Sequence, residues 1–421
     1  MRYKKRINEY VNVDRVGSQI TVYALNHPRV VTAFISNIRD GLKKGYQSFS
    51  IHFSVADQVF PCAIVPLTGI IEYLRRTGIE IEVKDNGFID QFQIDSPHKY
   101  SSDNGHVLNK VWCFENSTDV CLLVDSIIEA LAKEDKFYKG QLDTIEWSLN
   151  EVMDNVIQHS KAEIGYVMIQ IHKSRQVIAI TVFDFGQGIY KSLLNTKHNP
   201  RSAADAITLA IREGVTRDNS VGQGNGLFGL YSIVNKGKGT LYITSGGGSY
   251  MLNEGQSKVY ERIPTISREN PCTTIDFRLD YSLDLSINKA IIIKGKEHVI
   301  QSLRTEAFEN LESTYYTYLI KERAEGTGTR ESAERVKNDI ANILVSDPKP
   351  VILDFTGVEV ISSSFADELI AKLFMEFGLF QFNVMFKLKG LDSGQQRILQ
   401  KSVLQRIFVN MQDESKSSGL D

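Results

Sequence analysis

The residues with the clearest chemical capacity lie in one stretch, residues 145–160, which reads IEWSLNEVMDNVIQHS. Apolar residues recur in it every three or four positions, which predicts a helix with one buried side. Glu151, Asn155 and His159 follow at four-residue intervals and therefore share the opposite side. A carboxylate there can orient or deprotonate water, and an amide oxygen can bind a metal ion. The same row is also typical of a solvated helix surface, so only other parts of the sequence can distinguish a functional site from a solvated surface.

A second group follows an apolar stretch, residues 177–183, which predicts a strand. Asp184 comes directly after it, followed by Gly186 and Gly188. A carboxylate at a strand end can accept a hydrogen bond from an exocyclic amine, and glycines beside it let the backbone approach a flat ring. This group therefore favours recognition of a ring that carries an amine.

A third group is rich in glycine. Residues 222–229 read GQGNGLFG and precede a helical pattern at 230–235. Glycines before a helix leave backbone N–H groups free to bind a phosphate, and the helix dipole favours an anion there. One such loop is weakly specific, whereas the three groups in this order indicate a nucleotide site.

Together the motifs resemble those of the GHKL family, the ATP-binding domain shared by DNA gyrase, heat-shock chaperone ATPases, histidine kinases and mismatch-repair ATPases. The resemblance spans residues 120–280, and the helix is most similar to that of the anti-sigma-factor serine kinases. The four matching motifs, in chain order, are residues 151–159, 184–188, 224–229 and 273–277.

The resemblance implies an α/β sandwich around a mixed sheet that binds ATP with Mg²⁺. In this fold Glu151 would be the catalytic base or orient water, and Asn155 would bind Mg²⁺. Asp184 would bind the adenine amine, and Thr274 would contact the adenine side of the pocket. The role of His159 stays open, because a histidine at a helix end is as often structural. The other implied nucleotide contacts are Gly186, Gly188, Arg217, Gly222, Gly224, Gly226, Leu227 and Gly229.

Residues 190–221 correspond to the segment that covers the nucleotide in this family. They include a predicted helix at 202–213, and a segment between two glycine clusters can move when a ligand binds. Arg217, or alternatively Arg212 or Arg201, can reach the terminal phosphate, although each is also typical of a solvated surface.

Two regions that flank this centre share one pattern of helix, strand, loop, helix and strand. This order predicts parallel strands joined by right-handed crossovers. We interpret the regions as two copies of one domain type, which gives three domains with the boundaries 1–117, 118–284 and 285–421. The predicted elements are 30–44, 48–53, 62–77 and 79–83 in the first region and 333–345, 350–355, 365–377 and 381–388 in the second.

In the C-terminal region, residues 351–370 read VILDFTGVEVISSSFADELI. This stretch resembles the STAS fold of sulfate transporters and anti-sigma antagonists, in particular the STAS-like domains attached to ATP-binding proteins, and by the shared pattern the N-terminal region is interpreted as a STAS-like domain as well. In the antagonists, a GHKL serine kinase phosphorylates a serine at the start of the helix after the second core strand, and the match places it at Ser363. The sequence departs from the pattern at Ser362, where an aspartate is usual, and at Phe365, where a glycine is usual. Helix capping is the alternative role for these serines, since Ser364 and Asp367 nearly form a capping box.

Bulk composition constrains partners and location. The formal charge of −3 and pI near 6.3 give no basic excess for nucleic acid or an anionic membrane. The four cysteines form no CxxC pair that would indicate zinc or disulfides. No apolar run reaches the about 20 residues that span a bilayer, and the charged start lacks the apolar core of a signal peptide. These features predict a cytoplasmic protein.

Three functions fit these patterns. The first is a switch that binds ATP, hydrolyses it slowly and rearranges the STAS-like domains, through which a protein partner binds. The second is an anti-sigma-type serine/threonine kinase whose acceptor is Ser363 or the STAS domain of a partner. The third is an interaction module that binds ATP without catalysis, which an intact Glu151 disfavours. A homodimer is compatible with the resemblance, because GHKL domains often dimerise. A histidine kinase is not expected, because none of the eight histidines has the setting of a phospho-acceptor on a long helix.

Overall fold

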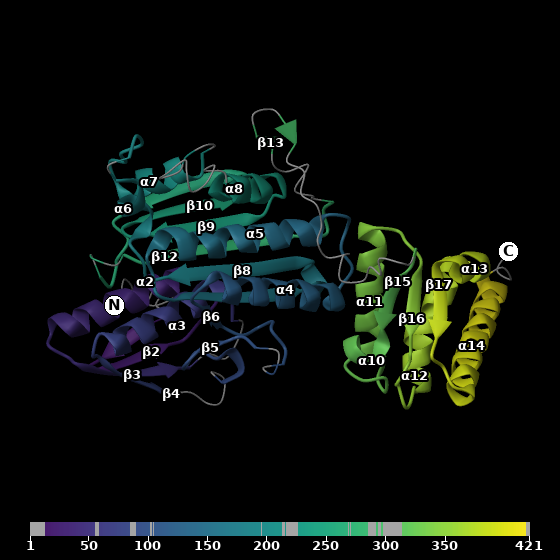
Figure 1. Cartoon of the computed structure of the whole chain (residues 1–421). Helices are drawn as coiled ribbons and strands as arrows, with labels where there is room; N and C mark the ends of the chain where they lie inside the picture. Colours follow the sequence, from purple (N-terminus) through teal and green to yellow (C-terminus); the bar gives the residue numbers. More distant parts are fainter. Residues whose placement is uncertain are drawn as a thin grey trace. The chain divides into compact units, whose positions relative to one another are not determined.

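The computed structural model of the chain describes residues 13–54, 59–84, 90–101, 103, 105–194, 196–212, 215, 226–267, 269, 271–284, 292–293, 296–297 and 314–417. The chain divides into two compact units, Met1–Ile128 with Asp143–Val299 and Glu129–Leu142 with Ile300–Asp421. Each combines helices and strands (Figure 1), so the predicted α/β (α+β) class is confirmed.

The N-terminal region forms a four-stranded sheet in the order β1-β2-β3-β4. The first pair is antiparallel, whereas β2, β3 and β4 are parallel, as the order of the predicted elements requires. The elements are β1 (Val13–Val16), β2 (Gln19–Val22), α2 (Arg29–Lys43), β3 (Ser48–Phe53), α3 (Pro61–Arg76) and β4 (Glu80–Lys84).

Helix α3 is buried along most of its length, because its sequence PCAIVPLTGIIEYL is apolar on every side. It shares one hydrophobic core with the neighbouring sheet, in which Phe183 packs against Gly69. The rings of Tyr73 and Phe185 stack with centroids 3.8 Å apart. The N-terminal region is therefore packed against the central sheet within the first unit, while the predicted domain boundary at 117 stays a prediction.

The central sheet has eight strands in the order β11-β10-β9-β12-β8-β7-β6-β5, and β12 lies antiparallel between β8 and β9. Its strands are β5 (His98–Lys99), β6 (Trp112–Phe114), β7 (Gly165–His172), β8 (Val177–Asp184), β9 (Thr240–Ser245), β10 (Gly248–Asn253), β11 (Gln256–Glu261) and β12 (Thr273–Asp280). The strand predicted at 177–183 is confirmed as β8.

Helices connect the strands of this unit. They are α4 (Ser117–Glu134), α5 (Gln141–Asn155) with a π-helical turn (Val156–Ser160), α6 (Gly188–Leu193), α7 (Ala203–Ala210) and α8 (Gly226–Lys236). Ser202 caps α7 by accepting a hydrogen bond from the Asp205 N–H at 3.1 Å. Shorter elements are the 3₁₀ turns at Asp90–Phe92 and Lys173–Arg175, and the strands β13 (Ile292–Ile293) and β14 (Lys296–Glu297).

The second unit contains a parallel sheet in the order β15-β16-β17 (Figure 1). Its elements are β15 (Tyr316–Leu319), α10 (Ile320–Arg323), α11 (Arg330–Ser346), β16 (Val351–Asp354), α12 (Ser363–Ala366), a π-helical turn (Asp367–Ala371), α13 (Lys372–Met385), β17 (Phe386–Lys389) and α14 (Ser393–Ser417). Three parallel strands in chain order, joined by helices, therefore occur in both flanking regions.

One predicted strand is wrong over most of its length. Residues 381–385 are helical, and β17 begins only at Phe386. Gly378 adopts a positive φ of 73°, so the helix is interrupted there and resumes. A short apolar run is compatible with either structure, which is why the sequence alone did not distinguish them.

Candidate functional site

Glu151 and Asn155 on α5 lie against the first residue of α8. A Cβ atom at Gly226 would collide with the Glu151 carboxylate and lie 3.7 Å from Asn155 Nδ2. Only glycine leaves the carboxylate in place at this contact. Two of the three groups predicted from the sequence are thus brought together by residues far apart in the chain.

Glu151 is half-buried and has an altered acidity. Burial, followed by the neighbouring charge of Asp154, raises the pKa of Glu151 above its ordinary value. Burial also raises the pKa of Asp154. A carboxyl whose pKa moves toward neutrality is better suited to exchange a proton at physiological pH.

Asn155 closes the last α-helical turn, after which the backbone changes to the π-helical turn. Its Nδ2 atom is buried and has no hydrogen-bond partner among the residues that the structure describes. Buried amides usually have partners, and π-helical turns occur frequently at functional sites. Asn155 is therefore a candidate ligand-binding residue on structural grounds as well.

Asp184 ends β8 and is buried. Its Oδ1 atom accepts a hydrogen bond from the Gly186 N–H at 2.8 Å. Burial raises the pKa of Asp184 to about 7, although the hydrogen bonds from Gly186 and Ser160 act in the opposite direction. A buried carboxyl without a cationic partner in the described part of the chain is an acceptor suited to a polar ligand.

The loop after β8 is fastened to the end of α5. The Gln187 N–H donates to the Ser160 carbonyl and the Gln187 side chain donates to the His159 carbonyl, both at 2.7 Å. A Cβ atom at Gly186 would lie 2.7 Å from the Ser160 Cβ. One helical segment, α5 with its π turn, therefore contacts both the start of α8 and the loop that carries Asp184.

The strand register separates the two adjacent threonines of β12. Thr273 pairs with Asp184, so the two side chains share one face of the sheet. Thr274 pairs with Phe183 and lies on the other face, which α3 covers. Thr273 is buried and hydrogen-bonded to the Ser245 hydroxyl at 3.0 Å. The sequence singled out Thr274, because the register that distinguishes it from Thr273 is not a local property.

The other predicted nucleotide contacts have different outcomes. Gly188 begins α6 with a φ of +73°, and a Cβ atom there would lie 3.1 Å from Ser245 Oγ. Leu227 and Gly229 lie in the first turn of α8, where Gly229 is buried. The last three, Arg217, Gly222 and Gly224, lie outside the described residues.

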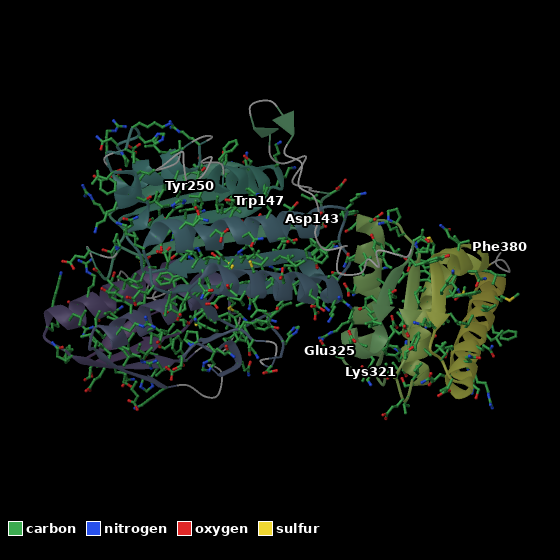
Figure 2. The ribbon with its side chains drawn as sticks, in the orientation of Figure 1. Asp143, Trp147, Tyr250, Lys321, Glu325 and Phe380 are labelled. Atoms are coloured by element: carbon green, nitrogen blue, oxygen red, sulfur yellow. The ribbon has the colours of Figure 1, made fainter. Side chains whose placement is uncertain are left out.

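A second group of polar residues lies at the ends of the three parallel strands of the second unit. Asp354 ends β16, where it accepts a hydrogen bond from the Thr356 N–H at 2.9 Å and forms an ion pair with Lys389 at 2.9 Å. Lys321 follows β15, and Figure 2 shows it at the end of this unit away from Phe380.

Ser363 lies at the start of the helix that follows β16. Ser362 caps this helix by accepting a hydrogen bond from the Phe365 N–H at 3.0 Å, whereas the sequence pointed to Ser364 as the capping residue. Ser363 itself is exposed. Ser362 therefore caps the helix, while the adjacent Ser363 is accessible to solvent.

Residues 332–396 match the family described as a STAS-like domain of unknown function (DUF4325). This part of the chain is a STAS-like domain. The match includes β16, β17 and Ser363. No curated protein matches the chain.

The STAS-like domain contains an ion-pair network beside Ser363, in which only Glu368 is fully buried. Glu368 is buried in the π-helical turn and accepts hydrogen bonds from Lys337 at 2.7 Å and Lys372 at 2.6 Å. Arg406 forms two hydrogen bonds with Asp367. These pairs fix the first turns of the helix that begins at Ser363.

Helix α11 of the STAS-like domain also binds residues 129–142 of the same unit. Asn342 is buried, and its Nδ2 atom donates hydrogen bonds to the Ala132 carbonyl at 2.9 Å and the Asp135 carbonyl at 2.8 Å. Its Oδ1 atom accepts a hydrogen bond from the Phe137 N–H at 2.8 Å. Asn342 thereby satisfies backbone groups at the end of α4. This role was not predicted from the sequence; polar side chains on the apolar side of the helix were the available signal.

Two features are absent from the part of the chain that the structure describes. No described helix has the length and apolar character needed to cross a membrane. Within the described ranges, no three His, Cys, Asp or Glu side chains gather as a metal site.

Proposed function

We propose that the chain is a GHKL-type ATPase that binds Mg-ATP between α5, the loop after β8 and the start of α8. The observation that carries this proposal is the contact of Gly226 with Glu151 and Asn155. It joins the first and third sequence motifs, and the hydrogen bonds of Gln187 join the first to the second.

The polar groups suit the parts of such a ligand. Asp184 accepts a hydrogen bond from the adenine amine, and Thr273 is the threonine on its face. The N–H groups at the start of α8 bind phosphate oxygens. The Asn155 side-chain oxygen is the ligand type that Mg²⁺ prefers, and the unpartnered amide beside it is compatible with a bound ligand. Mg²⁺ would neutralise charge on the phosphates.

Glu151 acts as the base that orients and deprotonates water. Its raised pKa and its place beside the start of α8 support this role. We expect Glu151→Ala to reduce ATP turnover by about 100-fold or more while changing ATP affinity by less than about threefold. Glu146→Ala, on the same helix, is the matched control and should retain turnover. Steady-state phosphate release and calorimetric titration measure the two quantities, and normal turnover by Glu151→Ala would contradict the role.

The nucleotide state acts as a switch on the STAS-like domain. Support comes from chain connectivity: residues 129–142 belong to the second unit, where they are held by Asn342, and α5 begins among them and continues to Glu151. We expect ATP binding to change amide hydrogen exchange at residues 129–142 and in α11. Exchange followed by mass spectrometry with and without Mg-ATP tests this expectation, with α2 as an internal reference. Unchanged exchange in α11 at saturating ATP would exclude the switch.

A second candidate is an anti-sigma-type serine kinase, which the exposure of Ser363 favours. A phosphate at the start of a helix is stabilised by the helix dipole. Incubation with γ-labelled Mg-ATP separates the candidates. Label released as phosphate supports the ATPase, label on Ser363 or on an added STAS-domain protein supports the kinase, and label retained as ATP supports an interaction module. The STAS-like domain is the proposed binding site for a protein partner in each case.

A further inference from the structure

On the face of the central sheet opposite Asp184, Arg278 forms no ion pair with a carboxylate among the residues that the structure describes. Arg278 lies five residues after Thr273 on β12 and therefore on the opposite face. Its side chain is half-buried, and its Nε atom is buried without a hydrogen bond. Its neighbours include the Cys62 sulfur, 3.9 Å from Nη2, and the Phe60 ring, 5.0 Å from Cζ. A partly buried guanidinium normally has an anionic partner.

Two histidines share the surroundings of Arg278. The ring of His172 lies 5.5 Å from the ring of Phe60, and its Nε2 atom is buried without a hydrogen-bond partner in the part of the chain that the structure describes. Burial, then Arg278 and Arg175, lower the pKa of His172. Arg278 and His172 both contact the Phe60 ring, and among the described residues neither Arg278 Nε nor His172 Nε2 has a hydrogen-bond partner.

His27 belongs to the same cluster. Its Nδ1 atom accepts a hydrogen bond from the Arg29 N–H at 3.1 Å, which leaves Nε2 as the protonated nitrogen of the neutral ring. Burial, then Arg29 and Arg278, lower its pKa. The Phe60 N–H donates to the Leu25 carbonyl at 2.8 Å, which holds the His27 segment beside the start of α3. The positive end of the α3 dipole adds to this field.

Two carboxyls lie on the same face as Arg278. Asp276 is buried and accepts a hydrogen bond from the Thr181 hydroxyl at 2.7 Å. Burial raises the pKa of Asp276 to about 6, while the charge of Arg278 and the Thr181 hydrogen bond act in the opposite direction. Asp280 accepts hydrogen bonds from Ser282 at 2.6 and 2.9 Å. Neither pairs with Arg278 among the described residues. The cluster therefore keeps an excess of positive charge from Arg29, Arg175 and Arg278.

We propose that Arg278, His172 and His27 bind an oxyanion of a small molecule on the sheet face opposite Asp184. The anion accepts hydrogen bonds from Arg278 Nε and the two imidazoles, while the exposed His27 and Arg29 leave the site open to solvent. Carboxylate and phosphate share the required chemistry. This site does not depend on the proposed nucleotide site, because the two lie on opposite faces of the sheet.

The test is a titration of the full chain, with ¹³C-labelled histidine, by inorganic phosphate and separately by acetate at constant ionic strength. His172→Gln and His27→Gln assign the two imidazole resonances. We expect saturable shifts of both resonances with at least one of the anions, and the comparison of phosphate with acetate identifies the preferred oxyanion. Sodium chloride at the same ionic strength should leave both unchanged. Shifts that are absent, or that chloride reproduces, overturn the proposal.

Two arginine variants and one control connect the shifts to this site. Arg278→Met should weaken binding by about tenfold or more, because a charge-assisted hydrogen bond is lost. Arg278→Lys keeps the charge and should bind with an affinity between those of Arg278→Met and the unmodified chain. Lys258→Met, at an exposed position of β11, should bind as the unmodified chain does. Equal affinity in Arg278→Met and the unmodified chain overturns the proposal.

Discussion

Two aspartates at strand ends share a local geometry and differ in their partners. Asp184 accepts a hydrogen bond from the N–H of Gly186, and Asp354 accepts one from the N–H of Thr356. Burial raises the pKa of Asp184 to about 7. Burial also acts on Asp354, but hydrogen bonds from Thr356 and the Lys389 ion pair outweigh it and lower its pKa. A cation therefore makes Asp354 structural, whereas Asp184 stays available to a ligand.

The same contrast applies to the parallel units around them. In the N-terminal region the helix after the second parallel strand, α3, starts at Pro61 and is buried against the central sheet. The corresponding helix of the STAS-like domain starts beside the exposed Ser363 and belongs to a core of its own. The two regions therefore share a topology, but α3 of the N-terminal region is buried, whereas the helix that starts at Ser363 of the STAS-like domain has an exposed first residue. That the N-terminal region is a second STAS-like domain stays a prediction.

The largest expected difference between Asp184 and Asp354 is in how each affects the pH dependence of the free energy of unfolding. The folded-state pKa of Asp184 lies above its unfolded value of 3.8, so the folded chain binds the proton more tightly. The contribution of Asp184 to stability must therefore fall as pH rises toward 7. The free energy of unfolding of the unmodified chain, minus that of Asp184→Asn, should fall by about 3 kcal/mol between pH 5 and 8.

Asp354→Asn provides the opposite sign as a control. Its folded-state pKa is lowered, so its contribution is present above the unfolded pKa and is lost only as pH falls below about 4. Urea unfolding at a series of pH values measures both differences. The contribution of Asp276, whose pKa is also raised, cancels because both chains retain it. Parallel pH profiles for the two variants would remove the distinction between the aspartates.

A smaller effect is expected on ligand binding. Asp184→Asn should weaken ATP binding by about 30-fold, or about 2 kcal/mol, because a charged carboxylate acceptor is replaced by a neutral amide. Asp354→Asn should leave ATP affinity unchanged. Calorimetric titration in the presence of Mg²⁺ measures both affinities. Equal losses in the two variants would mean that Asp184 acts through folding rather than through contact with adenine.

The sequence predicted most of the features that depend on local pattern. Glu151 and Asn155 share a helix face, and glycines stand at the start of α8, because helical period and chain order determine both. The strands of the central sheet were predictable from their apolar runs and turns. The contact between Gly226 and Glu151 was expected only through the family resemblance. The two residues have 74 residues between them in the chain, so no local pattern relates them.

The remaining features depend on contacts between distant segments. Thr273 differs from Thr274 only through its pairing with Asp184, and Asn342 has its partners in residues 129–142. The helical start at Ser362 differs from the expected cap by two residues, within the usual uncertainty of helix boundaries. The apolar run in α3 indicated burial but not the sheet against which it packs. Such pairings are set by the folded core as a whole.

The smallest expected effect separates the two serines at the accessible helix start. Ser362→Ala should destabilise the STAS-like domain by about 1 kcal/mol, because the Phe365 N–H loses its cap. Ser363→Ala should change stability by less than about 0.5 kcal/mol, because an exposed side chain is lost. Urea unfolding of the full chain, followed by hydrogen exchange in residues 363–385, measures both. If the chain transfers phosphate to itself, Ser363→Ala abolishes labelling and Ser362→Ala retains it. The reverse result would make Ser362 both the capping residue and the phosphate acceptor, and Ser363 would then have neither role.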